Sequence, residues 1–184
     1  MPEHPLPFTN RGTLPLGRWT VSLDEASTYV ETRDSTLRGE LWREWWSLVS
    51  AVRAAVCAVP ACWLAGSFFT SKVTPGDIDC VFILRRDHVE AARVDPAKSA
   101  LIEVVGRNQV KRDLNLEVGT FILEWWPRPG PHRGSNARRM RDYLENRGYW
   151  DDLWLRDRHI SADNVAASGI PTRGYLEVIV DGYT

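Results

Sequence analysis

The residues between Ala65 and Cys80 carry the side chains that are best suited to chemistry. Gly66-Ser67 follows an apolar run, and Asp77-Ile78-Asp79 opens the next apolar run after nine intervening residues. A glycine lets the backbone turn tightly and approach a ligand closely. A serine beside it offers a hydroxyl and a backbone N–H to a phosphate oxygen. The first half of this segment therefore suits phosphate binding.

The second half of the segment places two carboxylates around an apolar residue. Residues i and i+2 of a strand share a face, about 6.7 Å apart, so Asp77 and Asp79 point the same way while Ile78 points to the other side. A cation relieves the repulsion between two such carboxylates, and hard oxygen ligands favour Mg²⁺, which also binds substrate phosphates. Together the two halves predict phosphoryl or nucleotidyl transfer. Lys72, in the connecting loop, would meet a triphosphate as a point charge.

The same residues carry a family resemblance. Leu64-Ala65-Gly66-Ser67 followed by Asp77-Ile78-Asp79 resembles the signature of the DNA polymerase β-like nucleotidyltransferase superfamily. Three flanking segments are similar to a subgroup of small, mostly uncharacterised nucleotidyltransferase-like proteins of bacteria and their phages: Leu14-Pro15-Leu16-Gly17, Ser22-Leu23-Asp24-Glu25 and Arg173-Gly174-Tyr175-Leu176-Glu177-Val178. The resemblance implies an α+β fold, in which a single domain has a mixed β-sheet backed by helices.

The resemblance also implies an activity. A metal-dependent nucleotidyltransferase would move an NMP from an NTP to a hydroxyl on RNA, protein or a small molecule. Asp77 and Asp79 would hold Mg²⁺ or Mn²⁺, and the nucleotide would bind at Gly66, Ser67 and Lys72. Similar small enzymes act as toxins of toxin–antitoxin pairs, which makes RNA and protein the expected acceptors.

A third carboxylate usually completes the metal site of this superfamily, from a neighbouring strand that we predict over 114–126. The family pattern favours an aspartate where this chain has Gly119. Glu117 lies one pleat away on the same face and has a longer side chain than aspartate, so it is the predicted substitute, both as a metal ligand and as a catalytic residue. Glu124 and Asp113 are the other candidates, and a site with no third acid is the remaining one.

Two other functions share these motifs. Gly119 favours a catalytically degenerate protein on the nucleotidyltransferase fold, which would bind nucleotide or a partner as a regulator or complex subunit. Aminoglycoside-modifying enzymes carry the same motif but often have a further helical domain, for which little of the chain remains.

Composition sets the class of protein. A length of 184 residues with 43% hydrophobic and 26% charged residues fits one globular domain. The net charge of −1 gives no overall basic field that would indicate a nucleic-acid-binding protein. Cys57, Cys62 and Cys80 form no Cys-x-x-Cys pair, which argues against a disulfide scaffold or a zinc site. With no signal peptide or membrane span in the sequence, we expect a cytoplasmic protein with no membrane partner; the oligomeric state is left open.

Hydrophobic periodicity and turn residues predict an extended arm over 1–18, followed by one nucleotidyltransferase-like domain over 19–184. Ser22 and Glu25 form the start signature of a helix that runs to about Thr32. The further predicted elements are a helix over 35–58, strands over 61–66 and 77–84, a helical turn over 88–92, a helix over 96–107, the strand over 114–126, a helix over 135–147, an aromatic turn at Tyr149-Trp150, and a strand over 175–180.

Basic residues gather after the predicted third strand, over 128–133 and 138–141. They suit a triphosphate or an RNA backbone, and Trp125, Trp126 and Tyr149 would stack on a base. The favoured interpretation of 138–147 is instead a solvated helix face whose charges pair with each other.

Overall fold

The computed structural model describes residues 8–32, 36–127, 137–161, 164–167 and 169–183. Five strands form a mixed sheet in the order β1-β7-β2-β3-β4. These strands are β1 (Gly17–Ser22), β7 (Gly174–Ile179), β2 (Ala61–Ala65), β3 (Ile78–Arg85) and β4 (Val118–Trp125). β2 runs antiparallel to both of its neighbours, whereas β1 is parallel to β7 and β3 is parallel to β4. The chain is therefore a single α+β domain.

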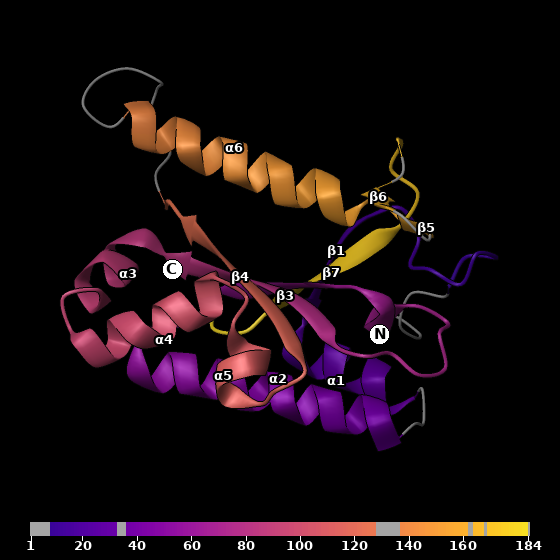
Figure 1. Cartoon of the computed structure of the whole chain (residues 1–184), viewed down its shortest axis with the longest axis horizontal. Helices are drawn as coiled ribbons and strands as arrows, with labels where there is room; N and C mark the ends of the chain where they lie inside the picture. Colours follow the sequence, from indigo (N-terminus) through magenta and orange to yellow (C-terminus); the bar gives the residue numbers. More distant parts are fainter. Residues whose placement is uncertain (1–7, 33–35, 128–136, 162–163, 168, 184) are drawn as a thin grey trace.

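Helices cover both faces of this sheet (Figure 1). One face packs against α1 (Leu23–Glu31), α2 (Thr36–Ala55), α3 (Arg86–Ala92), α4 (Pro96–Gly106) and α5 (Val110–Leu114), and the other lies beneath α6 (Ala137–Trp154). A 3₁₀ turn, η1 (Ser67–Phe69), follows β2, and a small hairpin of β5 (Arg158–Ser161) and β6 (Asn164–Ala167) follows α6.

Strand alternation divides the buried side chains between two cores. Leu64 and Phe82 point into the larger core, beneath α1 and α2, while Trp63 and Val81 point into the core beneath α6. Because β2 and β3 are apolar on both faces, they form the buried centre of the sheet. Gly66-Ser67 and Asp77-Ile78-Asp79 lie at the same end of these two strands.

The ends of the helices follow their sequence signals. Ser22 caps α1, since its Oγ accepts from the amide of Glu25 (3.2 Å) while the Glu25 carboxylate accepts from the Ser22 amide (2.7 Å). Asp95 caps α4 with its carboxylate alone, which accepts from the amides of residues 97 (2.9 Å) and 98 (3.2 Å), and Pro96 lies in the first turn. These two helices, α2, α3, β2, β3 and β7 confirm the elements predicted from the sequence.

Two predicted boundaries are wrong, and both matter for the site. The strand predicted from residue 114 begins only at Val118, because 110–114 form α5 and Asn115 ends it in a left-handed conformation (φ +54°). The aromatic turn predicted at Tyr149-Trp150 lies inside α6, whose apolar face continues to Trp154. β1, β5 and β6 were not predicted.

The segment before β1 packs on the domain. Residues 1–7 of the predicted arm lie outside the described residues, but Leu14 is fully buried. Thr13 bridges to Thr70, and the Gly12 carbonyl accepts from the Ser71 amide (2.7 Å). This part of the predicted arm therefore supports the loop that follows Gly66.

A buried carboxylate lies beneath α6. Glu177 of β7 is only 7% exposed and accepts hydrogen bonds from Thr20 Oγ1 (3.1 Å), Trp63 Nε1 (3.1 Å) and the Tyr183 hydroxyl (2.5 Å). Arg18 Nε lies 3.5 Å from it. Burial opposes the charge, but the hydrogen bonds from Tyr183 and Trp63 outweigh it and hold the pKa of Glu177 below its usual value.

We expect Glu177→Gln to lower the free energy of unfolding at neutral pH by about 1.5–3 kcal/mol, the contribution of hydrogen bonds to a charged group. The folded pKa lies below the unfolded value of about 4.3. The stabilisation by this carboxylate is therefore fully present above the unfolded pKa, and is lost as the pH falls through the folded pKa.

Urea unfolding across the acidic range measures this effect. The stability of the wild type should fall more steeply than that of Glu177→Gln as the pH drops from about 5 to about 3. Parallel curves for the two proteins would show that Glu177 is not the linked group.

Candidate functional site

Gly66 makes the turn that follows β2. It is the first residue of the motif loop, which we define as residues 66–72. Its φ of +81° lies in the left-handed region that glycine adopts at least cost. A Cβ at this position would overlap Oδ2 of Asp79, which lies on the neighbouring strand opposite Ala65. Both the backbone conformation and the carboxylate therefore require a glycine here.

Two arginines hold the motif loop in place. Arg38 of α2 is 5% exposed, and burial lowers the pKa of its guanidinium. The guanidinium donates to three carbonyl oxygens of the loop, those of Phe68, Thr70 (3.1 Å) and Lys72 (2.5 Å). On the other side of the loop, Arg173 Nη2 donates to the carbonyl oxygen of Gly66 (2.9 Å). These bonds occupy backbone carbonyls and fix the course of the loop.

Asp79 lies between two glycines. The parallel register of β3 and β4 places Gly119 opposite Asp79. A Cβ on Gly119 would approach Asp79 Oδ1 to 3.0 Å, which is tighter than ordinary contact. The carboxylate thus has Gly66 beside one oxygen and Gly119 beside the other. Gly119 thus leaves the space that this position of Asp79 requires.

A cavity of about 370 Å³ opens over these residues. Its lining comes from the end of β2, the motif loop, the start of β3, the end of α6 and the segment before β7. The lining residues are Ala65, Gly66, Ser67, Thr70, Asp77, Asp79, Leu153, Trp154, Arg156, Asp157 and Arg173. The structure thus brings together four predicted site residues, namely Gly66, Ser67, Asp77 and Asp79. Both aspartates are half-buried and can offer oxygens to a ligand in the cavity.

The wall opposite the aspartates carries charges of both signs. Arg156 forms an ion pair with Asp152, one turn earlier in α6 (2.7 Å). Asp157 accepts a hydrogen bond from Thr172 Oγ1 (2.9 Å). The carbonyl of Leu155 accepts from the amides of residues 172 (2.7 Å) and 173 (3.1 Å), which ties the end of α6 to the segment before β7.

The sequence prediction did not include Arg156 and Asp157 because it ended the helix at residue 147. The available signal for the longer helix was an apolar face formed by Met140, Tyr143, Trp150 and Trp154, which are three, seven and four residues apart. No role for Arg173 was predicted from the sequence.

The remaining predicted site residues lie elsewhere. Glu117 precedes β4 and forms an ion pair with Lys111, whose pKa is raised by its hydrogen bond to Glu117 and by the charge of that group. The Glu117 amide donates to a carboxylate oxygen of Glu44 (2.6 Å). The side chain of Lys72 is exposed. Neither Glu117 nor Lys72 is among the described residues that line the cavity.

The other candidates for a third acid are in ion pairs of their own. Glu124 lies 2.6 Å from Arg93, and Asp113 lies 2.6 Å from Arg112, which lowers the pKa of Asp113 through a hydrogen bond. Within the described ranges, no three acidic, histidine or cysteine side chains gather to hold a metal ion. A metal ion at this site would thus have two protein carboxylates, those of Asp77 and Asp79.

The fold and the cavity define a single-domain α+β protein with a glycine-serine loop facing two aspartates. The chain belongs to DUF6932, a family of unknown function whose model matches residues 6–179. Neither the curated proteins nor the solved structures include a match to the chain. None of its described helices is long and apolar enough to cross a membrane.

We expect Gly66→Ala to lower the free energy of unfolding by about 1–3 kcal/mol, because it forces a strained backbone and displaces the Asp79 carboxylate. Gly119→Ala should cost less, since Asp79 need move only slightly. Gly39→Ala is the matched control: it lies within α2 with open space around it, so it should raise stability by about 0.5–1 kcal/mol. Urea unfolding measures all three variants, and a Gly66→Ala protein as stable as the wild type would contradict this account of the turn.

Proposed function

We propose that this protein is a metal-dependent nucleotidyltransferase that moves an NMP from an NTP to a hydroxyl acceptor. One observation carries the proposal: Gly66, Ser67, Asp77 and Asp79 line a single cavity in which the Asp79 carboxylate lies between two glycines. The cavity volume of about 370 Å³ is within the range of small-molecule sites.

The two aspartates suit a hard divalent cation. They offer carboxylate oxygens from the same end of β3, and both are accessible from the cavity. Mg²⁺ is commonly bound by one or two carboxylates together with waters and substrate phosphates, so a third protein acid is not required for binding. When bound, Mg²⁺ or Mn²⁺ would neutralise phosphate charge and orient the reacting oxygens.

The rest of the cavity suits the nucleotide. Gly66 lets the backbone approach a phosphate, and Ser67 offers its hydroxyl. Arg156 and Arg173 also line this cavity, and their positive charges would attract a triphosphate. Leu153 and Trp154 supply apolar surface for a base.

We propose a direction for the reaction from the position of Asp79. In an in-line displacement, the acceptor oxygen bonds to the α-phosphorus as the bond to the bridging oxygen of pyrophosphate breaks, and the hydroxyl proton passes to solvent. With the triphosphate tail on the Gly66 side of Asp79, the acceptor would enter on the Gly119 side. The chain would act by positioning and charge neutralisation.

A second candidate function is a nucleotide- or partner-binding protein without turnover, acting as a regulator or complex subunit. The observation in its favour is the pairing of Glu117 with Lys111, which keeps the predicted third acid out of the cavity. Such a protein would retain the cavity and the motif loop.

Label transfer tests the first function. Each α-labelled NTP is incubated with the protein and either total RNA or total protein, with Mg²⁺ or Mn²⁺. We expect a labelled product whose yield falls about 10²–10³-fold in Asp77→Asn and in Asp79→Asn, because each removes a charge aimed at the phosphates. Asp24→Asn, on the outer surface of α1, is the matched control and should retain the wild-type yield.

Thermal unfolding with a non-cleavable NTP analogue and Mg²⁺ separates the two functions. A rise in the melting temperature without label transfer to any acceptor would favour the binding protein. The absence of both stabilisation and label transfer would reject both functions.

A further inference from the structure

β4 forms one end of the five-stranded sheet. Its inner edge pairs with β3 over the whole strand, and no strand in the described part of the chain pairs with its outer edge. Figure 1 shows β4 crossing between α6 on one side and α4 and α5 on the other. An outer strand edge presents backbone donors and acceptors that another chain can pair with.

Hydrogen bonds define which residues of β4 face outward. The carbonyl of Glu117 accepts from the Ile78 amide of β3 (3.2 Å), so residue 117 faces inward. The Thr120 amide donates instead to Oδ1 of Asn108 (2.8 Å), outside the sheet. Because backbone direction alternates along a strand, the N–H and C=O groups of Ile122 and Glu124 also face outward.

Two hollows lie beside this outward-facing stretch. One, of about 360 Å³, is lined on the α4 side by residues that include Ser99, Glu103 and Arg107. The other, of about 220 Å³, is lined on the α6 side by Asp142, Tyr143 and Asn146. Ile122 and Glu124 line both hollows, so the edge of β4 lies along the bottom of a groove between α4 and α6. We call this the β4 groove.

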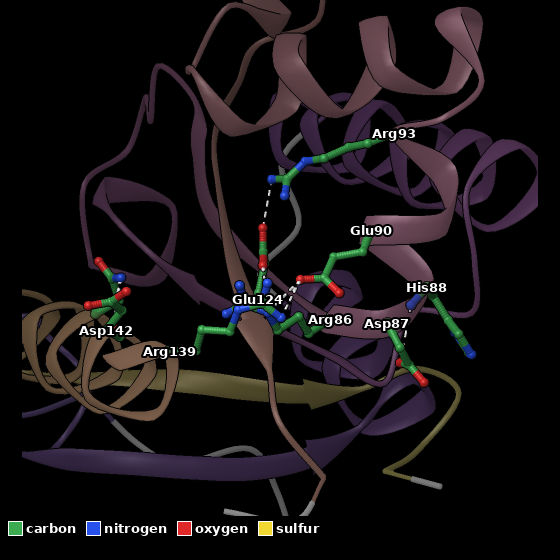
Figure 2. A network of polar contacts seen from close by, with 9 residues as sticks. Arg86, Asp87, His88, Glu90, Arg93, Glu124, Arg139 and Asp142 are labelled. Carbon is green, nitrogen blue, oxygen red and sulfur yellow. Dashed lines mark hydrogen bonds and ion pairs between the residues drawn. The ribbon is translucent and has the colours of Figure 1, made fainter. Parts of the chain in front are cut away.

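The charges of the β4 groove are paired with one another. Figure 2 shows Glu124 at the centre of this network, with Arg93 and Arg86 pointing toward it. The ion pairs join Arg93 to Glu124 (2.6 Å), Arg86 to Glu124 (3.8 Å), Arg86 to Glu90 (3.0 Å) and Arg139 to Glu90 (3.5 Å). A nucleic-acid backbone needs an excess of Lys and Arg. The two hollows are lined by three arginines, at 86, 93 and 107, and three acids, at 103, 124 and 142, so their charges balance. A groove of this kind with a strand edge at its bottom fits an extended polypeptide better.

We propose that the β4 groove binds an extended polypeptide segment, which pairs with Ile122 and Glu124 as an added strand. Each of these residues offers one outward N–H and one outward C=O, which gives the segment main-chain partners that do not depend on its side chains. The hollows on the α4 and α6 sides receive alternate side chains of the segment.

The groove leads toward the candidate site. Asn108 occupies the outer edge at Thr120, so the added strand must leave the edge there. Asn108 Oδ1 lies close to Gly119, where a Cβ would be 3.7 Å from it, and Gly119 lies beside Asp79. The segment then delivers a Ser, Thr or Tyr hydroxyl to the Gly119 side of Asp79. This step, and no other in the proposal, rests on the proposed function. The acceptor class would then be protein.

A proline substitution tests the main-chain pairing. Glu124→Pro removes an outward N–H but none of the bonds to β3, since the amide of residue 124 does not face that strand. Glu124→Ala is the matched control, because it loses the same ion pairs with Arg86 and Arg93 but keeps the N–H. The probe is a labelled peptide, selected from a displayed library of random short peptides on the wild-type protein without NTP or metal.

We expect Glu124→Pro to weaken binding of the selected peptide by about tenfold, and Glu124→Ala by about twofold or less. Two versions of the peptide are N-methylated, one at its odd-numbered amides and one at its even-numbered amides. Only one of the two should lose binding, and this result does not depend on how the variants fold. Hydrogen exchange at the Ile122 amide should slow when the peptide is bound.

Three results would overturn the proposal. The first is a library that gives no binder. The second is a peptide whose affinity changes neither with Glu124→Pro nor with N-methylation. The third is that sedimentation shows single-stranded RNA or a second copy of the chain bound at the groove, with binding that Glu124→Pro weakens. The peptide-binding assay contains no nucleotide, so it does not depend on the proposed function. Peptide binding without label transfer in the NTP assay would reject the proposed function but not the groove proposal. Label transfer without peptide binding would reject only the groove.

Discussion

The position of the Asp79 carboxylate is the constraint on which the site depends. Asp79 comes from a central strand, and its two oxygens lie beside glycines on either side, Gly66 at the end of β2 and Gly119 on β4. Neither neighbour can carry a side chain without moving the carboxylate. The pairing register of β2, β3 and β4 therefore determines where the Asp79 carboxylate can lie. Arg38 maintains this arrangement from the larger core, through its bonds to the carbonyls of the motif loop.

The central motif could be predicted from the sequence because its signals are local. An apolar strand, a Gly-Ser turn and an Asp-x-Asp strand start are all readable within one stretch, and the structure brings Gly66, Ser67, Asp77 and Asp79 to one cavity. The capping box at Ser22 is another local signal, and α1 begins there. The nucleotidyltransferase activity itself stays a prediction.

The features that were not predicted depend on contacts between distant segments. From the sequence, Gly119 stands where an acid is expected. Only the pairing of β3 with β4 shows that this glycine leaves room for Asp79. The alternating run from Leu114 has a strand pattern, yet the left-handed Asn115 interrupts it, and Glu117 then lies beside Lys111. Asp157 enters the cavity only because α6 continues past the aromatic pair at 149–150.

The short segment before β7 joins the two walls of the cavity. Its amides at residues 172 and 173 bond to the end of α6, while the side chain of Arg173 bonds to Gly66 at the start of the motif loop. The distance between the loop and the helix is thus set by one stretch of backbone that continues into a buried strand. The width of the cavity therefore follows from the position of β7, and the two walls can separate only if these bonds break or β7 shifts within the sheet.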